Sequence, residues 1–193
     1  MRYRLLAAVA AGTVILTIGG CTTSPDSGRP SAASASSKSG QPVNPYVQAS
    51  VDPPAPHEPV LTVVGGTTPL SLTLDELNSL GSATISIDEP FVNRRETYSG
   101  VPLAIVLAKA GIPDTATIDT DAIDHYHYVS VVKPMVDSKA LVATLRDGAP
   151  IPYDQGGPIR IVFPDGTPLS SVLDAWNWSL TSITVKNPSD AGR

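Results

Sequence analysis

The segment that most constrains the fold is residues 97–113, with the sequence TYSGVPLAIVLAKAGIP. Four apolar residues recur there at i, i+3, i+4 and i+7, which predicts a helix over residues 102–110 with one face for a core. These four residues are Leu103, Val106, Leu107 and Ala110. Pro102 fits the first helical position, where its missing N–H is not needed. Gly111 can turn left-handed at the helix end, and Pro113 prevents the helix from continuing.

The N-terminal segment, residues 1–20, has the three parts of a secretory signal peptide. Two arginines precede an apolar stretch, and two small glycines end it. Cys21, the one cysteine of the chain, follows at once, and ILTIGGC resembles the bacterial lipobox. The resemblance implies that the Cys21 thiol carries lipid, including acyl chains such as palmitate, which anchor an extracytoplasmic lipoprotein to a bacterial membrane. The alternative is an ordinary signal peptide or a short transmembrane anchor.

The rest of the chain divides into a tether, a domain and a tail. Residues 21–56 are dominated by Ser, Ala, Pro and Gly, which predicts a disordered tether. The chain has 193 residues, 41% of them hydrophobic, so residues 57–186 suffice for one domain with a core. Residues 187–193 form a C-terminal tail. A net charge of -5 without a basic stripe disfavours a nucleic-acid partner. A single cysteine excludes an intrachain disulfide and a Cys-based zinc site.

Short strands and helices alternate in the domain without regular βαβ spacing, which predicts an α+β fold with a mixed β-sheet. Strands are expected at residues 60–64, 83–87, 91–98, 126–132, 159–163 and 180–186. Thr73 and Glu76 form a capping box at a helix start. A Thr/Asp-rich loop is expected after Pro113. A further helix, capped by Asp137 or Ser138, is expected to hold Leu141, Val142 and Leu145, and a short helix is expected at residues 169–175.

Two motifs stand in the same order and at the same separation as in a known family. They are TYSGVPL at residues 97–103 and GGPIR at residues 156–160. With the pattern around them, they resemble the oxidoreductase molybdopterin-binding domain, the catalytic fold of sulfite oxidases and their bacterial relatives. The resemblance covers essentially the whole predicted domain, in a small lipoprotein version. It implies a sulfite oxidase-like fold and molybdopterin as a possible cofactor.

The family's enzymes hold molybdenum through the pterin and one cysteine thiolate, because a soft anionic sulfur donates strongly to the metal. The corresponding stretch here, ISIDEPFVNRRETY between Ile85 and Tyr98, has no cysteine. Asp88 and Glu89 stand near the position, and a hard carboxylate substitutes poorly for thiolate. The sequence therefore assigns no catalytic residue. Three residues remain as cofactor-binding candidates by resemblance: Arg160, Gly157 and Arg95. The alternative for Arg160 is a structural ion pair with a carboxylate such as Asp154 or Asp165.

Two further pairs are candidate ligand residues. His125 and His127 form H-Y-H, which can bind zinc or copper if Asp124 or His57 supplies a third ligand. Alternatively, His125 is a turn residue and Asp124 caps backbone amides. Trp176 and Trp178 form either core packing or one wall of a pocket.

Three functions follow from these observations. The preferred one is a non-catalytic binding or scaffold module on the membrane, with another envelope protein as its candidate partner. The alternatives are a molybdopterin-dependent oxidoreductase of the cell envelope and a metal-binding lipoprotein that uses His125 and His127.

Overall fold

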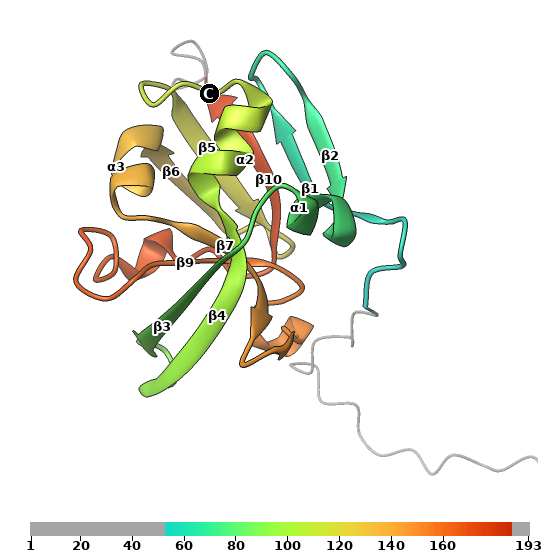
Figure 1. Cartoon of the computed structure of the whole chain (residues 1–193). Coiled ribbons are helices and arrows are strands. Elements are labelled where there is room, and N and C mark those ends of the chain that lie inside the picture. Colours follow the sequence, from blue (N-terminus) through green and yellow to red (C-terminus); the bar gives the residue numbers. More distant parts are fainter. Residues whose placement is uncertain (1–52, 187–193) are drawn as a thin grey trace, which may run out of the picture. The chain divides into compact units, whose positions relative to one another are not determined.

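The computed structural model describes residues 53–186, in which two β-sheets and three short helices surround one core (Figure 1). The first sheet has the strand order β2-β1-β10-β5-β6. Its strands are β1 (Pro59–Val64), β2 (Leu70–Thr73), β5 (Thr117–Ala122), β6 (His127–Val131) and β10 (Leu180–Lys186). β1 and β10 run parallel, and the other neighbours in this sheet are antiparallel. The predicted α+β fold with a mixed sheet is therefore confirmed.

The second sheet is antiparallel and is built on a long hairpin. Its strands are β3 (Ala83–Glu89), β4 (Arg94–Pro102), β7 (Leu141–Arg146), β8 (Ala149–Pro150) and β9 (Arg160–Val162). Figure 1 shows the β3–β4 hairpin reaching out from the helices toward the lower left. β7 lies at the centre of this sheet, because it pairs with β4, β8 and β9.

The helices follow local signals in the sequence. α1 (Leu74–Ser79) starts at the predicted capping box, in which Thr73 and Glu76 bond each other's backbone N–H groups. α2 (Leu103–Ala110) buries the four predicted apolar residues and ends at Gly111, whose φ of 69° is left-handed. Pro102 is the N-cap of α2 and not its first residue, a shift of one position.

The remaining helical elements are α3 (Val132–Asp137) and two 3₁₀ turns, Tyr153–Gln155 and Leu173–Ala175. No helix within residues 53–186 is long and apolar enough to cross a membrane. The predicted signal peptide and Cys21 lie outside the described residues, as does most of the predicted tether.

Two predicted elements were wrong. The Thr/Asp-rich stretch after Pro113 is not a loop but contains strand β5. The residues expected in a helix, Leu141, Val142 and Leu145, lie instead on strand β7. Residues 141–144 are all buried, so the strand lacks the polar alternation that marks a half-exposed strand. The strand expected from Phe91 also begins later, at Arg94, which leaves Phe91 in a turn.

Candidate functional site

The turn between β3 and β4 is organised by the buried carboxylate of Glu89. Glu89 Oε2 accepts the backbone N–H groups of Phe91 at 2.8 Å and Val92 at 3.0 Å. The residue is 1% exposed although it lies at the end of a hairpin. This turn occupies the stretch in which the family resemblance places the cysteine ligand. A carboxylate that holds the turn in shape therefore lies in the stretch that lacks the cysteine of the family's enzymes.

The same carboxylate neutralises Arg160, the basic residue of the GGPIR motif. Arg160 Nη2 donates to Glu89 Oε1 at 3.0 Å, and Arg160 is 1% exposed. The guanidinium also lies 4.2 Å from the ring centroid of Trp178, in cation–π contact. Burial lowers the pKa of Arg160, and its interactions with Tyr98 and Glu89 oppose that shift. The predicted structural pairing of Arg160 is present, with Glu89 as partner in place of Asp154 or Asp165.

Tyr98 continues this buried cluster toward a second carboxylate. The Tyr98 hydroxyl donates to Glu96 Oε2 at 2.7 Å, and it lies 3.5 Å from Arg160 Nη1. Glu96 Oε1 in turn accepts from Arg94 Nε at 2.7 Å. Burial is the main cause that raises the pKa of Tyr98, so its phenol stays protonated and acts as a donor. The Tyr98 hydroxyl therefore bridges the Glu89–Arg160 pair to Glu96, which pairs with Arg94 and also lies 3.9 Å from Arg146 Nη1.

Gly157 holds the backbone of GGPIR in place and offers no side chain to a ligand. A Cβ on Gly157 would lie 1.7 Å from the Ile151 carbonyl oxygen, so only glycine fits there. Its N–H donates to the Pro152 carbonyl oxygen at 2.8 Å, and a cis peptide bond joins it to Pro158. Its backbone N–H is thus already used within the protein.

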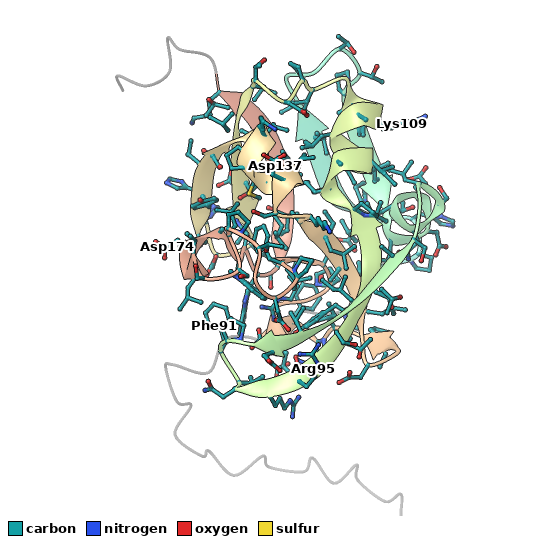
Figure 2. The ribbon with its side chains drawn as sticks, turned by 60° about the vertical axis from the view of Figure 1, so that its left-hand side comes forward. Phe91, Arg95, Lys109, Asp137 and Asp174 are labelled. Carbon is teal, nitrogen blue, oxygen red and sulfur yellow. The ribbon has the colours of Figure 1, made fainter. Side chains whose placement is uncertain are left out.

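Arg95, the third predicted cofactor residue, does not join Arg160. Its Nη1 pairs with Asp88 at 3.1 Å and Asp165 at 2.9 Å, and its side chain is 57% exposed. Figure 2 shows Arg95 at the lower edge of the β3–β4 hairpin, and its Nη2 also donates to the Ser86 carbonyl oxygen at 2.7 Å. Of the three predicted cofactor residues, Arg95 therefore lies in a surface ion-pair group of its own, whereas Arg160 is buried.

An aromatic pocket opens beside the Glu89–Arg160 pair. It has a volume of about 360 Å³. It is lined by Phe91, Asp124, Tyr126, Leu173, Asp174, Trp176 and Trp178. Phe91 meets Trp176 and Trp178 edge-to-face, with ring centroids 6.2 and 5.0 Å apart. Figure 2 shows Phe91 and Asp174 on the same side of the molecule. We name these seven residues the aromatic pocket.

Different segments hold the walls of the aromatic pocket together. The Tyr126 hydroxyl donates to the Asp174 carbonyl oxygen at 2.9 Å and so joins the β5–β6 loop to the 3₁₀ turn at 173–175. Both predicted roles of the tryptophans occur, because Trp176 is buried in the core cluster and also lines the pocket with the half-buried Trp178. Sequence reasoning missed Phe91, Tyr126 and Asp174, which come from three separate segments.

The two histidines do not act as a pair. His125 lies in the β5–β6 turn with a φ of 66°, and Asp124 Oδ1 accepts the N–H of Tyr126 at 3.0 Å. The turn roles predicted for these two residues are thus present. His127 is the first residue of β6 and lies close to Asp119 and Asp121, two carboxylates that sequence reasoning did not single out. Their alternation on β5 was the available signal, but the segment was expected to be a loop.

The residues present do not fit molybdopterin. The stretch between Ile85 and Tyr98 supplies no thiolate. Arg160, which is suited to a phosphate, is already paired with Glu89 and covered by Trp178. Among residues 53–186, those that line the aromatic pocket include the acidic residues Asp124 and Asp174 and no lysine or arginine. An anionic cofactor placed there would meet like charges without a compensating cation.

Comparisons with known proteins identify the domain. A model of the oxidoreductase molybdopterin binding domain matches residues 50–187. Among solved structures, the sulfane dehydrogenase SoxCD from Paracoccus pantotrophus matches with a TM-score of 0.53 and 17% identity, over 65% of this chain. The match spans 37% of the sulfane dehydrogenase chain, so it shows a shared fold for one part of a larger protein. No curated protein matches significantly. The chain therefore belongs to the oxidoreductase molybdopterin-binding domain family.

Proposed function

We propose that this protein is an extracytoplasmic lipoprotein, anchored to a bacterial membrane through Cys21, whose domain is a non-catalytic binding module. The signal peptide pattern and the lipobox-like ILTIGGC support the anchor. The family match supports a molybdopterin oxidoreductase-like domain. Another envelope protein is a further candidate partner of such a tethered module.

The observation that carries the proposal is the Glu89–Arg160 ion pair. In this pair the chain supplies its own anion to the arginine that the family motif provides. A phosphate would have to displace Glu89, which would leave a carboxylate buried without a cationic partner. Together with the missing thiolate, this supports a domain that does not hold the cofactor.

The aromatic pocket indicates what the module binds. Four aromatic rings and two carboxylates favour a small organic cation, because the face of an aromatic ring attracts positive charge and a carboxylate adds to the attraction. A volume of about 360 Å³ lies in the range of small-molecule sites. We propose a quaternary or alkylated ammonium compound as the ligand class.

The cofactor part is tested by expressing the full chain in a host that makes molybdenum cofactor. Molybdenum and released pterin are then measured per mole of folded, detergent-extracted protein. We expect neither at more than trace level. Near-stoichiometric pterin would favour the second candidate, a molybdopterin-dependent oxidoreductase of the cell envelope, which the family match supports. In that case Arg160→Ala should lower pterin occupancy.

The ligand part is tested by tryptophan fluorescence, because Trp176 and Trp178 are the two tryptophans of the chain and both line the pocket. Choline is the probe, and 3,3-dimethylbutan-1-ol is its neutral counterpart of the same shape. We expect saturable quenching by choline, with the neutral alcohol binding at least about fivefold more weakly, equivalent to about 1 kcal/mol.

Asp174→Asn should weaken choline binding by a similar factor. Asp137→Asn is the matched control, because Asp137 is an exposed carboxylate on α3 that pairs with Lys133 and lies outside the pocket. Equal binding of the two probes, or equal effects of the two variants, would contradict an organic cation as the ligand.

A further inference from the structure

We propose that Asp119, Asp121 and His127 form a binding site for a divalent transition-metal ion of the zinc type. One ligand atom from each of the three side chains lies within 4.8 Å of the other two. The site is separate from the aromatic pocket, since the two share no residue. It goes beyond the proposed function and does not depend on it.

The backbone register of two strands brings these residues together. In the β5–β6 ladder, Asp121 lies directly opposite His127, and side chains opposite each other in an antiparallel pair share a face. Asp119 lies two residues before Asp121 on β5 and so projects from the same face. The three side chains are therefore held by two paired strands and not by a flexible loop.

Asp119 supplies the observation that points to a ligand. Its side chain is 9% exposed, yet within residues 53–186 its Oδ1 atom has no hydrogen-bond partner. Its other oxygen, Oδ2, lies 3.3 Å from Lys186 Nζ. A buried carboxylate oxygen without a donor is costly, and a bound cation would compensate it. The same carboxylate belongs to the cluster that His127 and Asp121 complete.

The charge and the donor types favour a divalent ion. Asp119 and Asp121 together carry two negative charges, and among residues 53–186 the one side-chain cation in a salt bridge with either of them is Lys186. Carboxylate oxygens together with an imidazole nitrogen suit zinc and similar first-row ions. Three protein ligands leave a coordination position for water, and the exposed His127 side chain gives the ion access from solvent.

Small side-chain movements are sufficient to close the site. Ligand atoms around a tetrahedral zinc ion lie about 3.4 Å apart, as its bond lengths of about 2.1 Å require. His127 is exposed and Asp121 half-buried, so their rotamers can adjust while Asp119 stays in place. The ion would lie at the loop end of the β5–β6 hairpin, next to the loop that carries Asp124 and Tyr126 into the aromatic pocket.

This site differs from the H-Y-H site that the sequence suggests. His125 lies in the hairpin turn and is not part of the cluster. The other candidate ligands of His127 are instead Asp119 and Asp121 on the neighbouring strand β5. The two histidines therefore offer a matched pair of variants within one tripeptide. The aspartates offer a second pair, because Asp121 belongs to the cluster and Asp124 belongs to the turn.

The test is calorimetric titration of the metal-free, detergent-extracted full chain with Zn²⁺. We expect one equivalent of zinc to bind with micromolar or tighter affinity and to raise the unfolding temperature. His127→Ala and Asp121→Asn should each weaken the binding at least tenfold. His125→Ala and Asp124→Asn should change it less than twofold, since the amide introduced by Asp124→Asn keeps an oxygen that can accept the Tyr126 N–H.

Three results would overturn the proposal. One is the absence of saturable one-to-one binding by the folded chain. Another is binding that His127→Ala leaves unchanged. The third is equal loss in the His125→Ala and His127→Ala variants, which would assign the ion to H-Y-H instead. Circular dichroism of each apo variant separates lost binding from lost folding. If His127→Ala fails to fold, Asp121→Asn at the half-buried position gives the same comparison.

Discussion

Two buried charged residues of this domain, Arg160 and Asp119, differ in how far neighbouring groups compensate their charge. Arg160 is compensated inside the chain, because Glu89 pairs with it at 3.0 Å and the Trp178 ring covers it. Asp119 is compensated only in part, because Lys186 reaches one of its oxygens and the other has no donor among the described residues. The charge of Arg160 is thus paired within the chain, although its Nε atom has no hydrogen-bond partner among residues 53–186. Asp119 is left with negative charge that a cation can neutralise.

The difference shows why a family motif alone does not define a binding site. GGPIR still provides a buried arginine, but the charge that it offers to a ligand depends on a residue 71 positions away in the sequence. Asp119, Asp121 and His127 belong to no family motif named above, and their candidate ligand atoms nevertheless lie within 4.8 Å of one another. Charge balance in the folded state distinguishes the two regions.

The largest expected effect comes from breaking the compensated region. Glu89→Gln should lower the free energy of unfolding by about 3–5 kcal/mol, because it leaves the Arg160 guanidinium buried without an anion. Urea denaturation followed by tryptophan fluorescence measures this loss. Adding Arg160→Met to Glu89→Gln should restore at least half of it, since the double variant buries no unpaired charge.

Asp88→Asn is the matched control, because Asp88 is the neighbouring residue and its side chain pairs with Arg95 at the surface. An exposed pair contributes at most about 1 kcal/mol. If Glu89→Gln lowers the free energy of unfolding no more than Asp88→Asn does, the buried Glu89–Arg160 pair does not stabilise the fold.

A smaller effect should sharpen the contrast at the second region. Lys186→Met removes the cation that lies 3.3 Å from Asp119 Oδ2, so the uncompensated charge grows. We expect zinc affinity to rise about fivefold, equivalent to about 1 kcal/mol, because the ion no longer meets a neighbouring positive charge. Calorimetric titration against the unmodified chain measures the change.

Lys133→Met removes a comparable exposed lysine, on α3, and should leave zinc affinity unchanged. Weaker zinc binding in Lys186→Met would contradict the view that Lys186 and the ion compete for Asp119.

Features encoded by near neighbours were predictable. The helix over Leu103–Ala110, its end at Gly111 and the capping box at Thr73 were all identified from the sequence, because each depends on residues within four positions. Strand β7 was predicted as a helix. Both of its faces are covered over residues 141–144, so its sequence lacks the alternation of apolar and polar residues that indicates a strand. Strand β5 was missed, because its aspartates are typical of loops.

The sequence by itself determined the family pattern, the local helix signals and the absence of a cysteine between Ile85 and Tyr98. Only the tertiary structure decided that Glu89 pairs with Arg160, that Arg95 pairs with Asp88 and Asp165, and that His127 lies near Asp119 and not His125. The physical reason is the separation in sequence between the residues that interact. Capping and turn formation act between neighbours in the chain, whereas strand register and charge pairing depend on residues that the fold alone brings together.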